Sequence, residues 1–311
     1  MLAIIAPGQG SQTPGFLSPW LEDSNLRELL SKFSSAIGLN LEHLGTQSGP
    51  DEIRATANAQ PLIVSAGLLA MKSLGDVSFS VTAGHSVGEI TSAAIARVIS
   101  ADDAMALVRE RGLAMAVAAS ASPTGMSAIL GGEREEVLAI LTSLGLVAAN
   151  ENGAGQIVAA GGLEALAKLS ETPPPGARVR TLEVAGAFHT QVMAPAVGHL
   201  SEYAAKMQTR DPACTVISNK DGGALSSGRE ILNRIVSQIA NPVRWDLCMA
   251  AMGKLGVSAV IELPPAGTLV GLIKRSLPGV ETLALKTPND LDAARELIAR
   301  HAGKNERVGT K

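Results

Sequence analysis

Short apolar runs rich in β-branched residues recur along the chain, and longer stretches with helical periodicity separate them. The apolar runs cover residues 2–6, 77–83, 214–218, 257–263 and 282–285. Strands that alternate with helices of this length predict an α/β fold with a mostly parallel sheet. The alternation of Val77, Phe79 and Val81 favours a half-buried strand in that part of the sheet.

A different order of elements is predicted between residues 123 and 186. Strands are expected at 126–130, 146–151, 156–160 and 177–184, and helices at 133–144 and 163–169. This β-α-β-β-α-β order is the ferredoxin-like pattern. We therefore expect a discontinuous larger α/β domain (1–122 and 187–301), a ferredoxin-like insertion (123–186) and a polar tail (302–311).

Composition and charge narrow the class of protein. The 311 residues are 46% hydrophobic, which excludes intrinsic disorder and fibrous architectures, and the net charge of -3 predicts no binding to nucleic acid or to an anionic membrane. No apolar stretch approaches the ~20 residues of a membrane span, so we expect a soluble, cytoplasmic protein. The two cysteines, Cys214 and Cys248, suit a reducing compartment and are too few for a four-cysteine zinc site, so no metal is expected.

The segment Gly84-His85-Ser86-Val87-Gly88 follows a predicted strand and precedes a stretch of small residues that suits a helix. Strand, G-x-S-x-G and helix together form the nucleophile elbow of serine enzymes. A sharp turn needs a glycine on each side of the serine, and free N–H groups at the helix start can stabilise an oxyanion. The alternative is a glycine-rich turn in which Ser86 is incidental.

Serine is a weak nucleophile at neutral pH and needs a base. His189 is the best placed histidine because it follows a predicted strand and a Gly-Ala-Phe turn. His85 adjoins the serine and is expected to point elsewhere, and His199 suits a surface or interhelical position. No carboxylate stands out as the partner of His189, so either an acid or a backbone carbonyl could hold its second ring nitrogen.

Arg111 falls on the apolar stripe of a predicted helix at 101–119, together with Ala104 and Leu107. A guanidinium on an apolar face must find an anion, because its desolvation is otherwise costly. That anion is either a structural carboxylate such as Glu89 or a carboxylate of the substrate, bound through two parallel hydrogen bonds. Periodicity does not choose between these two interpretations.

A glycine-rich loop, Pro7-Gly8-Gln9-Gly10-Ser11-Gln12, follows the first predicted strand, at the end of the strand where α/β proteins bind ligands. The loop matches neither the dinucleotide fingerprint nor the P-loop, so phosphate binding is not supported. Gln9 lies between two glycines and could bring its backbone N–H near Ser86 as an oxyanion donor. The alternative is a simple tight loop.

Five motifs occur in order along the chain: Pro7-Gly8-Gln9-Gly10-Ser11-Gln12, Gly84-His85-Ser86-Val87-Gly88-Glu89, Arg111-Gly112, Ala187-Phe188-His189 and Asn241-Pro242-Val243-Arg244-Trp245. Together they resemble the malonyl-CoA:acyl carrier protein transacylase family, which includes the acyltransferase domains of polyketide synthases. The resemblance covers nearly the whole chain, to about residue 300. It implies an α/β-hydrolase-like larger domain with a ferredoxin-like insertion, in agreement with the predicted element order.

The resemblance also assigns roles to residues. It implies that Ser86 is the acylated nucleophile, that His189 is the base and that Arg111 pairs with the malonyl carboxylate. It implies that the backbone N–H groups of Gln9 and Val87 form the oxyanion hole.

Further positions follow from the same resemblance. A backbone carbonyl around Arg244 would hold the second nitrogen of His189, and Asn150 and Asn152 would line the site. Phe188 resembles the malonyl-selective version, in which a bulky ring leaves little room for an α-methyl branch. One departure is visible at residues 263–267, Leu-Pro-Pro-Ala-Gly, where many relatives have Gly-Pro-Gly. This departure affects the expected loop shape and carrier docking, and not the chemistry.

The implied activity is a ping-pong transfer of malonyl from malonyl-CoA to the phosphopantetheine thiol of an acyl carrier protein, in fatty acid or polyketide synthesis. No bound cofactor is expected, and Lys274, Arg275, Arg178 and Arg180 are candidates for docking an acidic carrier. One alternative is a serine hydrolase or thioesterase of the α/β-hydrolase type, which would not need Arg111. Another is a non-catalytic subunit that binds the carrier.

Overall fold

The structure, a computed structural model, describes residues 1–301, so the predicted tail at 302–311 lies outside the described residues. The strands are β1 (Leu2–Ala6), β2 (Val81–Gly84), β3 (Thr124–Gly131), β4 (Val147–Gly153), β5 (Gln156–Gly162), β6 (Ala177–Thr181), β7 (Thr215–Ile217), β8 (Ala224–Leu225), β9 (Val243–Arg244), β10 (Ala259–Glu262) and β11 (Glu281–Ala284). The α-helices are α1 (Ser24–Ile37), α2 (Leu41–Thr46), α3 (Pro50–Arg54), α4 (Thr56–Leu74), α5 (Gly88–Ile95), α6 (Ala101–Ser120), α7 (Arg134–Ser143), α8 (Leu163–Glu171), α9 (Ala194–Ala205), α10 (Gly228–Ser237), α11 (Trp245–Lys254), α12 (Thr268–Ser276) and α13 (Leu291–His301). Short 3₁₀ helices are η1 (Trp20–Glu22), η2 (Gln191–Met193), η3 (Gln238–Ala240) and η4 (Pro288–Asp290).

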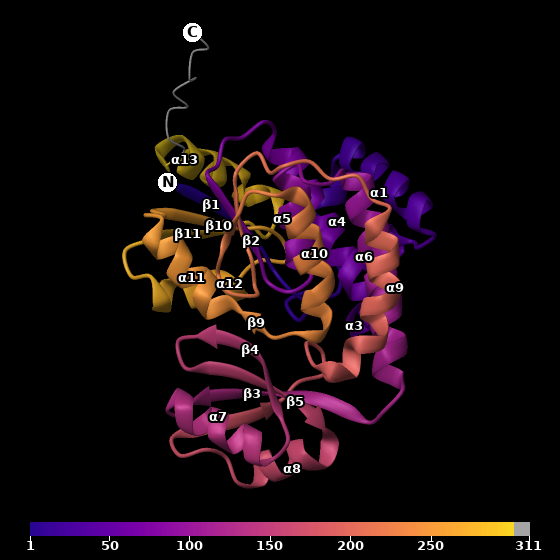
Figure 1. Cartoon of the computed structure of the whole chain (residues 1–311). Coiled ribbons are helices and arrows are strands. Elements are labelled where there is room, and N and C mark those ends of the chain that lie inside the picture. Colours follow the sequence, from indigo (N-terminus) through magenta and orange to yellow (C-terminus); the bar gives the residue numbers. More distant parts are fainter. Residues whose placement is uncertain (302–311) are drawn as a thin grey trace.

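The larger sheet has six strands in the order β11-β10-β1-β2-β7-β8, and all of its pairs are parallel except β7 with β8. The prediction of a mostly parallel sheet is therefore confirmed. Alternate residues of β1 face opposite sides of this sheet. Leu2 and Ile4 enter a core built with α1, α4, α6 and α9, and Ala3 and Ile5 enter a second core built with α11 and α12. Figure 1 shows where these helices lie around the larger sheet. Burial on both faces explains why β1 is apolar without interruption.

The strand predicted at 77–83 is shorter than expected. Pairing on both of its sides begins at Val81, which lies opposite Ala3 of β1 and Thr215 of β7. Val77 and Phe79 precede the ladder and pack against the larger core from a loop. The half-buried strand was a wrong prediction, because β2 lies in the interior of the sheet and all four of its residues are buried.

The smaller sheet has the order β6-β3-β5-β4-β9. Its first four strands pair antiparallel, and the chain order β3-α7-β4-β5-α8-β6 agrees with the predicted one. Helices α7 and α8 contribute Val137 and Leu166 to a third core, which also includes Ile129 of β3. Figure 1 shows this unit as a separate layer below the larger sheet. The fifth strand was not predicted: β9 comes from the later part of the chain and pairs parallel with β4.

Helix α6 confirms the helix predicted at 101–119 and leads from the larger unit into β3. It begins after Ser100, whose side chain accepts a hydrogen bond from the backbone N–H of Asp103. Its buried face packs against α4 and carries Arg111 into the interior between the two sheets. None of the helices in residues 1–301 combines the length and the apolar character that crossing a membrane would require.

Candidate active site

Ser86 lies on a strained turn between β2 and α5. Its φ is 54°, a left-handed conformation that a residue with a side chain adopts at a cost of order 1–3 kcal/mol. The glycines on either side are required sterically. A Cβ at Gly84 would overlap the main chain of Gly88, and a Cβ at Gly88 would overlap the carbonyl oxygen of Ala6. The turn predicted from G-x-S-x-G is therefore present, with Ser86 ahead of the first turn of α5.

A buried asparagine that the sequence reasoning missed holds this turn. Asn219 lies two residues after β7, and its Oδ1 accepts a hydrogen bond of 2.8 Å from the backbone N–H of Ser86. Its Nδ2 donates to the carbonyl of Gly84 at 2.7 Å. Because the N–H of Ser86 is engaged in this way, an oxyanion hole must use other donors.

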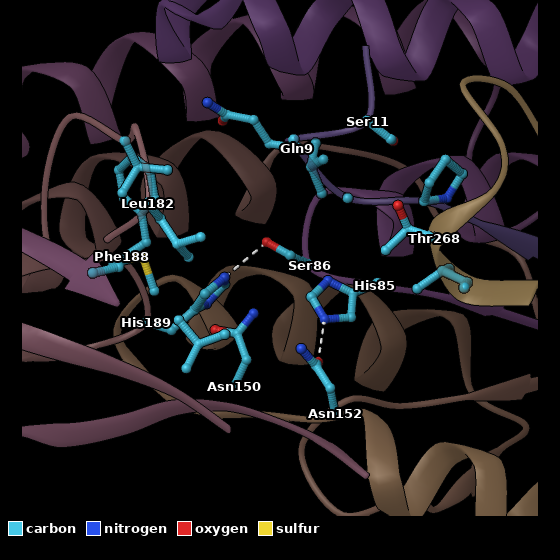
Figure 2. Close-up of a pocket in the computed structure, with 18 of the residues that line it drawn as sticks. Gln9, Ser11, His85, Ser86, Asn150, Asn152, Leu182, Phe188, His189 and Thr268 are labelled. Carbon is cyan, nitrogen blue, oxygen red and sulfur yellow. Dashed lines mark hydrogen bonds between the residues drawn. The ribbon is translucent and has the colours of Figure 1, made fainter. Parts of the chain in front are cut away.

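His189 is the histidine that the structure brings to the serine. Its Nε2 lies 2.8 Å from Ser86 Oγ (Figure 2). Its Nδ1 lies 2.8 Å from the carbonyl oxygen of Gln238. Since a carbonyl can only accept, Nδ1 carries the proton and Nε2 presents its lone pair to the hydroxyl. Burial, followed by the charge of Arg111, lowers the pKa of His189 to about 3. The ring is therefore neutral at physiological pH and suited to take a proton.

The carbonyl that holds His189 belongs to Gln238 and not to Arg244, so that prediction needs correction. Gln238 begins η3, and this turn directs its carbonyl at the ring. Arg244 lies six positions later in β9, where its backbone belongs to the strand that pairs with β4. The N–H of Arg244 donates to the carbonyl of Asn219, and its guanidinium pairs with Asp246.

The other histidines near the site have partners of their own. His85 Nε2 lies 2.9 Å from Asn152 Oδ1, and the ring meets Trp245 edge-on with the centroids 5.7 Å apart. It does not serve Ser86 Oγ, as expected, although it lines the same cavity. His199 of α9 lies 2.7 Å from Glu110 of α6 and is exposed, in agreement with the interhelical position.

Arg111 is 1% exposed and is held by neutral groups. Nη1 donates to Gln60 Oε1 at 2.6 Å, and Nη2 donates to Gln238 Oε1 at 3.0 Å. Nη2 also approaches Ser86 Oγ at 3.4 Å, while the buried Nε has no acceptor among residues 1–301. Burial lowers the pKa of Arg111 to about 10, so the side chain remains charged at neutral pH.

Glu89 does not pair directly with Arg111, and the structural ion pair considered from the sequence is wrong. Glu89 Oε1 accepts from the N–H of Asn219 at 2.6 Å, and Oε2 accepts from Gln238 Nε2 at 2.6 Å. No carboxylate oxygen in the described part of the chain lies within the 4.0 Å limit of an ion pair with Arg111. Burial raises the pKa of Glu89 to about 7. A guest anion would thus find a guanidinium with no direct counter-charge.

Gln9 and Val87 both line the cavity at Ser86. The side chain of Gln9 is turned away, since its Nε2 donates to the carbonyl of Arg54 at 3.0 Å. The backbone N–H groups of Gln9 and Val87 donate no hydrogen bond to any acceptor within residues 1–301. They are therefore free to meet a developing oxyanion, which the N–H of Ser86 is not.

The cavity has a volume of about 240 Å³ and lies between the two sheets. Phe188 forms part of its apolar wall, and Asn150 and Asn152 reach it from β4 (Figure 2). Asn150 Oδ1 is buried without a hydrogen-bond donor among the residues described. Other lining residues come from both units: Pro7, Gly8, Gly10, Ser11, Gln60, Met115, Met126, Gln156, Val158, Leu182, Val184, Thr268, Leu269 and Leu272.

The surroundings of the cavity bear on the docking candidates. Lys274 and Arg275 are exposed on α12, the helix that lines the cavity with Leu272. Arg178 and Arg180 are exposed on the edge strand β6. The unusual loop at 263–267 is buried as far as residue 266, so it offers little surface to a partner.

Comparison with known proteins gives a consistent result. The acyl transferase domain family matches residues 4–297. The chain is 52% identical to the malonyl CoA-acyl carrier protein transacylase of Mycobacterium tuberculosis over 305 residues. This alignment covers 96% of this chain and 100% of the relative. The crystal structure of MCAT from Mycobacterium tuberculosis matches with a TM-score of 0.91 at 52% identity, over 95% of this chain and 99% of the other. A malonyl-transacylase in complex with its type II PKS acyl-carrier protein matches with a TM-score of 0.89 at 28% identity, over 95% and 99%.

Proposed function

This chain belongs to the acyl transferase domain family, among the malonyl-CoA:acyl carrier protein transacylases, and we propose that it transfers malonyl through a covalent ester on Ser86. The donor is malonyl-CoA, and the acceptor is the phosphopantetheine thiol of an acyl carrier protein. The steps use only side chains and main-chain N–H groups of this chain, together with the thiol that the partner brings. A cytoplasmic location is part of the proposal and is supported by two free thiols, Cys214 and Cys248.

The first half-reaction loads the serine. Ser86 Oγ attacks the thioester carbonyl carbon while Nε2 of His189 takes its proton. The N–H groups of Gln9 and Val87 stabilise the oxyanion, and one such donor contributes about 2.7–4 kcal/mol in enzymes where it has been removed. The carbon–sulfur bond then breaks, and His189 returns the proton to the sulfur of CoA. The malonyl group remains as an ester on Ser86.

The second half-reaction reverses these steps onto a new acceptor. The phosphopantetheine thiol gives its proton to His189, and its sulfur attacks the ester carbonyl. The bond to Ser86 Oγ breaks, and Oγ recovers its proton from His189. The products are the malonyl-carrier thioester and the free enzyme, so atoms and charges balance.

The observation that carries this proposal is the environment of Arg111. A buried guanidinium beside the nucleophile, held by the amides of Gln60 and Gln238, keeps its positive charge for a ligand. A malonyl thioester supplies the matching carboxylate, which an arginine can bind through two hydrogen bonds. A neutral acyl group, such as a serine hydrolase would take, has no charge to match this guanidinium. We further propose that Phe188, in the wall of the cavity, disfavours an α-methyl branch on the acyl group.

A mass measurement tests the ester. The protein is incubated with malonyl-CoA without a carrier, and the intact mass is compared between the parent and Ser86→Ala. We expect an increase of one malonyl group in the parent and none in the variant. If malonate is released without any carrier as fast as malonyl is transferred when the carrier is present, the protein is instead a hydrolase. An unmodified parent mass would favour a non-catalytic carrier-binding subunit.

The domain organisation is also a proposal. We assign residues 1–122 and 187–301 to an α/β-hydrolase-like catalytic domain and residues 123–186 to a ferredoxin-like insertion. The strand order β6-β3-β5-β4, with α7 and α8 on one face, supports the insertion. In this arrangement the insertion supplies Asn150 and Asn152 to one wall of the cavity.

Carrier docking is proposed at the exposed basic side chains near the cavity. Lys274 and Arg275 on α12 are placed to attract an acidic carrier. Replacing both with alanine is expected to weaken the salt dependence of turnover with the carrier and to leave the loading of Ser86 unchanged. An unaltered salt dependence would remove these residues from the proposal.

A further inference from the structure

One buried glutamine joins the two halves of the proposed site. The backbone carbonyl of Gln238 accepts from His189 Nδ1, and its side-chain Oε1 accepts from Arg111 Nη2. The same residue therefore contacts both the base and the cation. The position of the Gln238 side chain determines which atom Arg111 meets.

The orientation of this amide is determined by the groups behind it. Gln238 Nε2 faces three oxygen acceptors: Glu89 Oε2 at 2.6 Å, Asn219 Oδ1 at 3.0 Å and the carbonyl of Ser86 at 3.2 Å. If the amide were flipped, Oε1 would face these acceptors and the NH₂ group would face the guanidinium. An acceptor would then face acceptors on one side, and a donor would face the donors of Arg111 on the other. Each buried polar atom left without a hydrogen bond in this way is costly.

Glu89 provides the shortest contact among those three acceptors and is the only one of them that can ionise. Its other oxygen is occupied by the N–H of Asn219, so both carboxylate oxygens act as acceptors toward fixed donors. In the ionised form of Glu89 these hydrogen bonds are charge-assisted, and such bonds are roughly twice as strong as neutral ones. Glu89 is also 5% exposed, so water does not compete for its bonds.

We propose that Glu89 is a positioning residue for acid recognition, which holds the amide of Gln238 so that Oε1 faces Arg111 and keeps the guanidinium toward the cavity. The inference rests on the proposed role of Arg111 as the site of the substrate carboxylate. Glu89 touches neither Arg111 nor His189, and it acts through Gln238.

Glu89→Gln tests this role, because a carboxamide cannot accept at both ends. One end of the new side chain must present an NH₂ group to the N–H of Asn219 or to Gln238 Nε2. The readout is the ratio of kcat/KM for malonyl-CoA to kcat/KM for acetyl-CoA, which isolates recognition of the free acid. We expect this ratio to fall by about tenfold, as for the loss of one hydrogen bond to a charged group.

A double-variant cycle shows whether the effect passes through Arg111. In the Arg111→Ala background, adding Glu89→Gln should leave the remaining malonyl-to-acetyl ratio unchanged, since the cation is already absent. If Glu89→Gln lowers both substrates equally in the parent, the residue is merely structural and the inference is overturned. If Arg111→Ala itself leaves the ratio unchanged, the proposed role of Arg111 fails instead.

Two further variants guard against unfolding and unspecific effects. Glu262→Gln makes the same chemical change at another buried carboxylate, which caps α12 through the N–H groups of Gly267, Leu269 and Val270. It should leave the malonyl-to-acetyl ratio within about twofold of the parent.

Should Glu89→Gln fail to fold, Gln238→Met removes the amide and keeps the backbone carbonyl for His189. This variant should lower the ratio, and an unchanged ratio would contradict the inference.

Discussion

Two kinds of arginine environment occur in this protein, and they differ in what surrounds the guanidinium. Arg111 is buried and is held by Gln60 and Gln238. Arg134 and Arg244 are held by carboxylates: Arg134 makes a two-bond pair with Glu151, and Arg244 makes a two-bond pair with Asp246.

The contrast appears again in their ionisation. Burial lowers the pKa of Arg111, whereas hydrogen bonds to carboxylates raise the pKa of Arg134 and Arg244. The charge of an arginine that already has a carboxylate partner is neutralised, and its role is to stabilise the fold. An arginine held by amides retains an unmet demand for an anion, which a substrate can satisfy.

Removing the unpaired cation should have the largest effect. We expect Arg111→Ala to lower kcat/KM for malonyl-CoA by about 10³, because the substrate carboxylate would enter a dry site without its partner. The value for acetyl-CoA should fall much less. Steady-state kinetics with both donors make the measurement, and equal losses would remove the distinction between the two arginine environments.

Converting one environment into the other should have a smaller effect. Gln60→Glu keeps the shape of the side chain but gives Arg111 a carboxylate partner, like that of Arg244. We expect kcat/KM for malonyl-CoA to fall on the order of tenfold, since the substrate must compete with an internal anion. Gln60→Met, which removes the acceptor without adding charge, is the matched control. A malonyl rate that survives Gln60→Glu would show that the free charge of Arg111 is not required.

The charge of Arg111 should also be visible in the pH dependence. After burial, it is the largest cause that lowers the pKa of His189 to about 3, so the parent base stays neutral well below pH 6. Without that charge the pKa of His189 rises, and a protonated ring cannot take the serine proton. In Arg111→Ala, the decline of kcat/KM for acetyl-CoA on the acidic side should therefore begin at higher pH than in the parent. Coincident profiles would contradict the coupling.

The smallest effect is expected at the carboxylate-paired arginine. The Arg134 side chain is 51% exposed, and without it Glu151 keeps a second arginine, Arg244, at 3.4 Å. Arg134→Ala should change the free energy of unfolding by less than about 1 kcal/mol and leave kcat/KM within about twofold of the parent. Urea unfolding and steady-state kinetics check both values. A large loss of malonyl transfer would place this second arginine in the site as well.

Much of the site could be predicted from local sequence. The turn at Ser86 could be predicted from its flanking glycines, because the requirement for glycine is steric and involves residues only four positions apart. The apolar stripe of α6 placed Arg111 inside the protein. The choice between a structural and a substrate anion could not be made from the sequence, since Gln60 and Gln238 lie 51 and 127 positions away.

The carbonyl partner of His189 was misplaced and Asn219 was missed for the same reason, namely that their contacts join distant segments of the chain. The motif around Arg244 located the right region for the partner of His189 but not the right carbonyl, which depends on η3 and on the pairing of β9 with β4. Asn219 gave no signal in the sequence, because an isolated asparagine after a short strand is common. Its contacts with Gly84 and Ser86 cross more than 130 positions.

The sequence by itself determined the alternation of strands and helices, the strained serine turn and the burial of one cation. These follow from periodicity and from steric rules that act over a few residues. Only the tertiary structure decided which groups hold that cation and that base. Hydrogen bonds between distant segments depend on how the two sheets pack, and local patterns do not contain that information.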